Sequence, residues 1–280
     1  MNVLSWLKSC LNHGSNSFIP ATVISVIAQH WKSDPEIFPF LKKCIENSQN
    51  VSVRKAAVRS IAQGWQEPDT LLLLKQYIDH NQNFDVRSTS IEMIAQGWKE
   101  ESETLPILKH YIHNNQNFDV RRAAVVAIAQ GWKEESETLS LLKERAIDDR
   151  NEYVRGAALV AIFQGWKDEA NTISFLKERA IKDNYGYVQR IALDAIAQGW
   201  KDNPQTFDFL YDNVLNPRFV RRYDSQANPC QIILEVMLKY YSDNPRYIEL
   251  LHFVSEQDPD TKLREFAEQE LKNQVNKNYL

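Results

Sequence analysis

The segment Val120-Arg-Arg-Ala-Ala-Val-Val-Ala-Ile-Ala-Gln-Gly-Trp132 decides the fold of this chain of 280 residues. If its first valine is offset 0 and each residue turns by about 100°, the apolar offsets 0, 4, 5, 8 and 12 lie within an arc of about 140°. The rest of the helix surface is small or polar. This pattern predicts an amphipathic helix that buries one face.

Tryptophan closes the same pattern at nearly constant intervals along the chain. The positions, 34, 33, 34, 34 and 34 residues apart, are Trp31, Trp65, Trp98, Trp132, Trp166 and Trp200. Two neighbouring copies, 94–105 and 128–139, share the sequence IAQGWKEESETL. A fixed period of this length is the signature of a repeat array. We interpret residues 1–280 as one array, with a seventh unit that ends near Tyr241 and a weaker unit after it.

Each unit also contains an earlier helical stretch, such as 138–147. A capping side chain followed by proline marks its start in three units, at Asp34-Pro35, Asn203-Pro204 and Asn244-Pro245. No segment sustains the apolar–polar alternation that is typical of strands. The predicted fold is therefore all-α, a solenoid of about eight antiparallel helical pairs that forms a right-handed α–α superhelix.

Five of the eight glycines immediately precede a repeated tryptophan, at Gly64, Gly97, Gly131, Gly165 and Gly199. A glycine at a helix end commonly adopts the left-handed conformation and turns the next residue back onto the last turn. The first unit has His30 at this position, where that conformation would be strained, so close helix packing is the alternative explanation. Under either explanation we expect the tryptophans to seal each unit against the next.

Composition argues against several classes of protein. The net charge of −4 and the isoelectric point of about 5.9 disfavour polyanion binding through bulk charge. Three cysteines without a Cys-x-x-Cys pair predict packing residues in a reducing, cytoplasmic location rather than a disulfide scaffold or a zinc site. The longest apolar run, 123–129, is too short to span a bilayer, so no membrane association is expected.

Sequence motifs of catalysis are absent. The chain lacks the glycine-rich phosphate-binding loops, the Gly-x-Ser-x-Gly nucleophile turn and the His-Glu-x-x-His zinc motif. His110 and His113 lie three residues apart, but no third ligand accompanies them. We therefore expect a protein that is not an enzyme and that holds neither a cofactor nor a metal.

The second helix of most units opens with valine and arginine. The pairs are Val53-Arg54, Val86-Arg87, Val120-Arg121, Val154-Arg155, Val220-Arg221 and, with leucine, Leu263-Arg264. Together with the Ala-Ala-Val/Leu that follows, this opening resembles the HEAT repeat family in its short bacterial form. The signatures of tetratricopeptide and ankyrin repeats are absent.

The resemblance implies a ladder of aspartate and arginine along the solenoid. Asp149 and Asp258 stand six residues before the arginines Arg155 and Arg264, which fits such a ladder. In other units the ladder pattern changes, through the residues Asn81, Asn115 and Gln189. Asp85 and Asp119 are candidates to replace the missing aspartates. The alternative partner for the repeated arginine is the phosphate or carboxylate of a ligand.

A longer phrase, W-K-D/E-x-P/S-E-T-L-x-x-L-K-E-R-A followed by V-R-x-A-A-V-x-A-I-A-Q-G-W, extends the resemblance. It is similar to repeat arrays found C-terminal to NACHT-type NTPase modules in cyanobacterial signalling proteins. The chain itself carries no NTPase motif. The resemblance therefore implies a detached sensor array or a free-standing scaffold of a NACHT-like signalling or defence system.

Offsets 2, 6, 9 and 13 of the second helices point away from the predicted core, toward the expected concave side. Over five regular units eight of these positions are basic and two, Glu92 and Asp194, are acidic, so eight minus two gives +6. The basic positions, which we call the basic stripe, are Lys55, Arg59, Lys99, Arg122, Lys133, Lys167, Arg190 and Lys201. Val126, Val160 and Phe163 place apolar side chains among them.

These positions predict a groove with a basic rim and an apolar centre that binds a protein or an acidic peptide, with Phe163 as its anchor. An ordinary solvated surface is the alternative interpretation. Nucleic-acid binding along the stripe is a second candidate function, and a HEAT-like phycobilin lyase component is a third. Arg218, Arg221 and Arg222 precede an insertion at 223–230 that is a further candidate binding loop.

Overall fold

A computed structural model describes residues 3–11, 18–215 and 228–277 of the chain. These residues form sixteen α-helices and no strand. The first eight are α1 (Val3–Cys10), α2 (Phe18–His30), α3 (Ile37–Asn47), α4 (Val51–Gly64), α5 (Pro68–His80), α6 (Phe84–Gly97), α7 (Thr104–Asn114) and α8 (Phe118–Gly131). The others are α9 (Thr138–Asp148), α10 (Glu152–Trp166), α11 (Thr172–Lys182), α12 (Gly186–Gly199), α13 (Pro204–Leu215), α14 (Pro229–Tyr241), α15 (Pro245–Gln257) and α16 (Thr261–Lys277).

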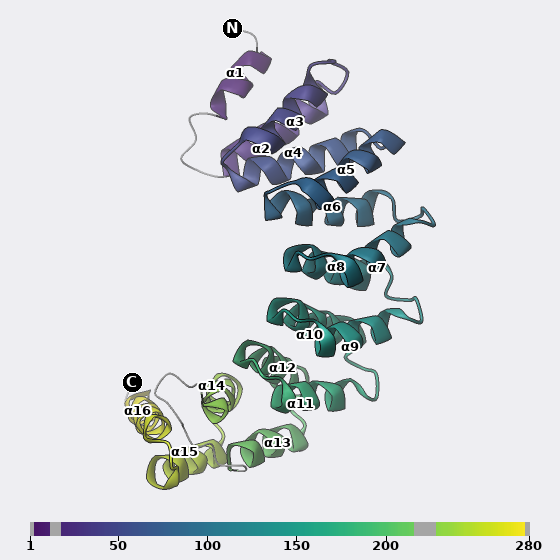
Figure 1. The fold of residues 1–280 in the computed structure, drawn as a ribbon. Helices are drawn as coiled ribbons and strands as arrows, with labels where there is room; N and C mark the ends of the chain where they lie inside the picture. The colour runs from purple at the N-terminus through teal and green to yellow at the C-terminus, as the bar shows by residue number, and fades with distance from the viewer. Residues whose placement is uncertain (1–2, 12–17, 216–227, 278–280) are drawn as a thin grey trace. The chain divides into compact units, whose positions relative to one another are not determined.

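The helices alternate between two layers, and the chain divides into two compact units, residues 1–140 and 141–280. Within the first unit the even-numbered helices α2, α4, α6 and α8 stack on one another, and each of α4, α6 and α8 packs against the helix before it (Figure 1). Within the second unit α10, α12 and α14 stack in the same way. The predicted all-α solenoid of helical pairs is thus confirmed.

The buried face of the second helices follows the predicted arc. Offsets 0, 4, 5 and 8 are buried in all five regular units; in α8 they are Val120, Ala124, Val125 and Ile128, each 0% exposed. Offset 12 varies, because Trp98, Trp132 and Trp166 are buried whereas Trp65 and Trp200 are half-buried. Each buried valine or isoleucine contributes about 1.5–3 kcal/mol, so this face supplies much of the core.

Asparagine and proline mark helix starts as expected. The Oδ1 atom of Asn50 accepts a hydrogen bond of 2.9 Å from the backbone N–H of Ser52, and so caps α4. Asn228 caps α14 in the same way, with Pro229 in the first turn. Asn228-Pro229, near the end of the predicted insertion at 223–230, is therefore the start of a helix.

At four of the five Gly-Trp positions the glycine ends its helix without the left-handed conformation, and Gly165 lies inside α10. Gly64, Gly97, Gly131 and Gly199 are the last residues of their helices, and none has a positive φ. Close packing explains only the last of them, because a Cβ atom on Gly199 would lie 2.6 Å from Cε2 of Phe163. A Cβ on Gly64 or Gly131 would meet nothing within 4 Å.

The backbone carbonyl of the tryptophan that follows accepts a side-chain hydrogen bond. In three successive units a buried threonine at the start of the next first helix donates its Oγ1–H to that carbonyl: Thr104 to Trp98 at 2.5 Å, Thr138 to Trp132 at 2.6 Å and Thr172 to Trp166 at 2.7 Å. This bond satisfies a backbone acceptor at the helix end and fixes where the next helix begins.

The first helices of the second unit are joined by cations that lie over aromatic rings. Lys143 of α9 lies 5.6 Å from the ring centroid of Phe175 in α11, and Lys177 of α11 lies 4.8 Å from that of Phe209 in α13. Burial lowers the pKa of Lys177. The side chains of this layer are thus engaged with neighbouring first helices.

The glycines provide a test of this local structure. We expect Gly64→Ala and Gly131→Ala each to stabilise the protein by about 0.5–1 kcal/mol, because alanine has the higher helix propensity and the added methyl group meets no neighbour. Gly199→Ala should destabilise it, since the ring of Phe163 must shift. Urea denaturation of the three variants measures the difference; stabilisation by all three would contradict the packing described at Gly199.

Candidate partner-binding surface

The basic stripe occupies two kinds of position. Lys55 and Arg59 on α4, Arg122 on α8 and Arg190 on α12 lie on second helices and are half-buried or exposed. The remaining lysines come after the helical residues: Lys99, Lys133 and Lys201 follow the ends of α6, α8 and α12, and Lys167 is the C-cap of α10. These four are exposed beside the connection to the next first helix, not on the helical face.

Each arginine of the basic stripe forms an ion pair with a carboxylate of the same chain. Nη2 of Arg59 lies 3.1 Å from Oε2 of Glu92 on α6, and Arg190 pairs with Glu235 on α14. Arg122 lies 3.7 Å from Asp119 within its own helix. The sequence count of +6 leaves out Asp119 and Glu235, so the excess of positive charge on this face is smaller than that count.

The apolar positions differ from one another in exposure. Val160 on α10 is 37% exposed, whereas Val126 and Phe163 are half-buried. The ring centroid of Phe163 lies 6.1 Å from that of Trp200, and its edge covers Gly199. Phe163 therefore packs across the seam between α10 and α12, and Val160 is the apolar side chain of the three that projects most.

Two exposed tyrosines on α10 and α12 were not predicted. Tyr153 on α10 and Tyr187 on α12 are 44% and 45% exposed, and their ring centroids are 5.0 Å apart. A Cβ atom on Gly156 would lie 2.8 Å from Cε1 of Tyr187, so the glycine makes room for this ring. The sequence held a signal for this contact, because glycine stands at offset 2, where other units carry larger side chains.

A groove runs along the seam between α2 and α4. Its volume is about 840 Å³, and it extends from Ala21 and Ser52 near the helix starts to Lys32 and Gly64 at their ends. Lys55 and Arg59 of the basic stripe line it, together with short hydroxyl side chains. Lys32 was missed because the stripe was counted only over the regular units, although it follows Trp31 as the other lysines follow their tryptophans.

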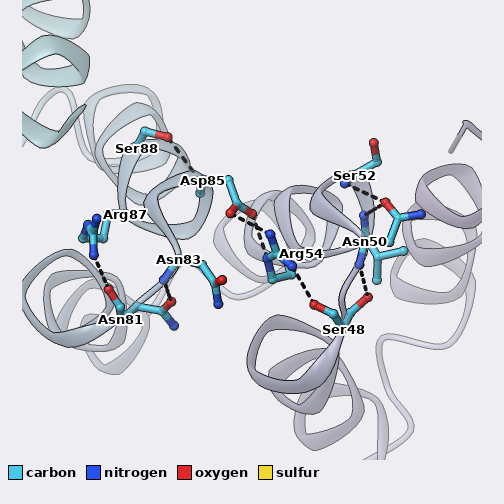
Figure 2. A network of polar contacts seen from close by, with 10 residues as sticks. Ser48, Asn50, Ser52, Arg54, Asn81, Asn83, Asp85, Arg87 and Ser88 are labelled. Carbon is cyan, nitrogen blue, oxygen red and sulfur yellow. Dashed lines mark hydrogen bonds and ion pairs between the residues drawn. The ribbon is translucent and has the colours of Figure 1, made fainter.

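The repeated arginine lies at the turn between the two helices of each unit. Its Nη1 group donates a hydrogen bond to the carbonyl oxygen six residues earlier, over 2.6 Å from Arg54 to Ser48, 2.6 Å from Arg87 to Asn81, 2.9 Å from Arg121 to Asn115, 2.8 Å from Arg155 to Asp149 and 2.6 Å from Arg264 to Asp258. Figure 2 shows the first two. The residue six positions before the arginine thus accepts this hydrogen bond through its backbone carbonyl oxygen.

The side chain of that acceptor residue closes the turn itself. Oδ1 of Asn81 accepts a hydrogen bond of 2.9 Å from the backbone N–H of Asn83, and Oδ1 of Asp149 accepts one of 2.9 Å from Asn151 (Figure 2 shows the first). Asparagine and aspartate perform this function equally well, because both offer a side-chain oxygen two residues before the donor. This explains why asparagine replaces aspartate in some units.

Carboxylates join the arginine to the following unit. Arg54 donates two hydrogen bonds, of 2.9 and 2.8 Å, to Asp85 at the start of α6, as Figure 2 shows. Arg155 donates two, of 2.8 and 2.9 Å, to Asp183, which raises the pKa of Arg155. All four side chains are less than a tenth exposed. Such buried, bidentate pairs fix the position of one unit on the next.

Not every unit has this pair. Nε of Arg87 is buried without a hydrogen-bond partner among the described residues. Asp85, a candidate to replace the aspartate missing at Asn81, pairs with Arg54 of the preceding unit. In the last described pair of units, the Nδ2 group of Asn228 donates to Asp260 over 2.8 Å. Val220, Arg218, Arg221 and Arg222 and most of the expected insertion lie outside the described residues.

Comparison with known proteins agrees with this construction. The family model described as HEAT repeats matches residues 4–95, 38–129, 71–163 and 105–197. The chain belongs to the HEAT repeat family. A solved structure of the Escherichia coli protein YibA is similar to this HEAT solenoid, with 18% sequence identity, a TM-score of 0.49, and coverage of 97% of this chain and 93% of that chain. No curated protein matches the chain.

The possible metal ligands among residues 3–11, 18–215 and 228–277 are histidines, cysteines and carboxylates. No group of three potential metal ligands occurs there, and Nδ1 of His110 lies 3.2 Å from Nδ2 of Asn114. Cys10, Cys44 and Cys230 form no disulfide bond, and burial raises the pKa of Cys44 to about 11. Among the described helices, none combines the length and the apolar character required to cross a bilayer.

The pairs between units provide a stability test. We expect Arg155→Met to destabilise the protein by about 3–5 kcal/mol, because Asp183 would be left buried without its partner. Arg122→Met, which removes the same charge from an exposed pair, should cost less than about 0.5 kcal/mol. Urea denaturation measures both. The double variant Arg155→Met/Asp183→Leu should recover part of the lost stability. A double variant no more stable than Arg155→Met would argue against a direct pair.

Proposed function

We propose that this HEAT solenoid is a non-enzymatic scaffold that binds a partner protein through the exposed face of its second helices. HEAT repeats are generally protein-interaction scaffolds, and the fold is typically non-enzymatic. The observation that carries the proposal is the group of exposed side chains on α10 and α12. Tyr153, Val160 and Tyr187 are between 37% and 45% exposed on a layer whose opposite side is the core. Exposed apolar and aromatic side chains of this kind commonly anchor protein interfaces.

The first and second helices differ in which side chains are engaged with neighbouring helices. In the second unit the first helices engage their cations and aromatic rings with each other, as in the pairs Lys143–Phe175 and Lys177–Phe209. The second helices α12 and α14 hold the ion pairs Arg190–Glu235 and Lys239–Asp194 across their seam. On the neighbouring second helix α10, Tyr153 and Val160 stay exposed, and a combination of charged and apolar groups is typical of surfaces that bind proteins.

The finer points of the proposal concern the partner and its setting. The basic positions on the second helices favour an acidic partner, and the similarity to arrays beside NACHT-type NTPases favours a signalling or defence system. The three cysteines favour a reducing, cytoplasmic location. Nucleic acid remains the alternative ligand that the basic positions suggest, and it predicts binding that falls steeply with salt concentration.

Capture of partners by two matched variants tests the surface. The full chain, Val160→Asp and Ile181→Asp serve as baits in cells that express the protein naturally, and bound proteins are quantified by mass spectrometry. Ile181 on α11 is 42% exposed, close to the 37% of Val160, but belongs to a first helix. We expect one protein that the wild type and Ile181→Asp retain and that Val160→Asp loses by about tenfold, because a charge at the interface centre must be desolvated.

Circular dichroism of the three baits, together with their urea denaturation midpoints, controls for loss of folding. Equal loss of the partner from both variants, or capture that is indifferent to Val160→Asp, would contradict the proposed surface. Capture that disappears after nuclease treatment would favour nucleic acid in place of a direct protein contact.

A further inference from the structure

The groove between α2 and α4 is positive on both sides. Lys32 lies just beyond the end of α2, Lys55 and Arg59 belong to α4, and all three line the groove of about 840 Å³. Neither helix contains an aspartate or a glutamate. The groove therefore has three cations and no carboxylate in its lining, in a chain whose net charge is −4.

Three other seams between second helices are crossed by side chains that contact each other. The α4–α6 seam has the pair Arg59–Glu92, and the α12–α14 seam has Arg190–Glu235 and Lys239–Asp194. At the α10–α12 seam the rings of Tyr153 and Tyr187 meet. The α2–α4 seam has no acidic residue on either helix with which to form such a crossing pair.

Small side chains keep the groove open along its length. Ser25, Ala28, Ala56 and Ser60 form its walls and floor, with Gln29 among the polar groups near its far end. Ser25 is exposed, whereas Ala28, Ala56 and Ser60 are buried. The shape is thus an elongated trough between two parallel helices, with cations distributed along it and hydroxyl and amide groups available for hydrogen bonds.

We propose that the α2–α4 groove binds an acidic peptide segment of the partner protein, whose carboxylates pair with Lys32 and Lys55, beside Arg59, which also pairs with Glu92. This inference rests on the proposed scaffold function and adds a second, electrostatic contact in the other compact unit. Charge complementarity carries it, because the cations of the groove have no carboxylate within their own pair of helices.

The chemistry of the groove favours carboxylates spread along a peptide over a single phosphate group. A phosphate site commonly uses a bidentate arginine and free N–H groups at a helix start. Here Arg59 already contacts Glu92, and Oδ1 of Asn50 accepts from the N–H groups of Ser52 and Val53 at the start of α4. Lysine ammonium groups act as separate point charges, which suits several carboxylates along an extended segment.

Nucleic acid fits this groove less well than an acidic peptide. A nucleic-acid backbone requires a longer track of cations, and the seam that follows on α6 presents Glu92 beside Arg59. The basic side chains of the groove are also accompanied by small residues, without aromatic rings in the lining on which bases could stack.

Fluorescence anisotropy with a labelled Glu-Ser repeat peptide tests the groove in the full chain. Lys32→Gln/Lys55→Gln should weaken binding by about tenfold, because two of the three cations are lost. Lys43→Gln/Lys182→Gln removes the same charge from exposed lysines on the first helices α3 and α11, outside the groove and the basic stripe, and should change the affinity by less than about twofold. Ser25→Trp, which fills the trough without changing its charge, should weaken binding as the first variant does.

Several outcomes would overturn the proposal. The first two are equal loss of peptide affinity in the two lysine variants and unchanged affinity in Ser25→Trp. The others are equally tight binding of a Gln-Ser repeat peptide, and tighter binding of a single-stranded oligonucleotide that depends on the same two lysines. If peptide binding fails these tests but partner capture still depends on Val160, the groove proposal is rejected and the proposed partner surface stands. Peptide binding without Val160 dependence rejects the proposed partner surface on α10 and α12 and leaves the groove.

Discussion

A guanidinium group at the turn between paired helices is the interaction on which the rest of the structure depends. The Nη1 group of Arg54 binds the carbonyl oxygen of Ser48, which orients the second helix relative to the first. Its remaining nitrogens reach Asp85 of the next unit, so one side chain sets the geometry both within and between units. Burying a charge is costly unless it is fully paired, and the bidentate geometry meets that requirement.

This constraint also explains why one face of the second helices can vary. Because the arginine and the apolar arc hold each helix, the opposite side carries no structural obligation and can hold Val160 in one unit and Arg59 in another. Where neighbouring helices come close, that side is used for packing instead, as Gly156 and Tyr187 show. Differences between repeats are therefore concentrated on the surface that we assign to partner binding.

The sequence predicted the helices and the buried arc because both depend on residues within one turn of each other, as in Val120–Ile128. It did not predict the partner of Arg155, because Asp183 lies on another unit and comes close only through packing. The prediction of a left-handed glycine was wrong for a similar reason. The hydroxyl of Thr104 donates to the carbonyl oxygen of Trp98, so the helix can end without a glycine turn. Lys99 and its counterparts lie beyond the helix ends, where angular offsets no longer apply.

The carboxylate that completes each buried pair comes later in the chain than the arginine, by 31 residues for Arg54 and by 28 for Arg155. During synthesis a unit can close its own turn as soon as its second helix begins, but its buried charge stays unpaired until the next unit has left the ribosome. During synthesis, therefore, the buried pair between two units can form only after the later unit has been made, although a unit can close its own turn before that.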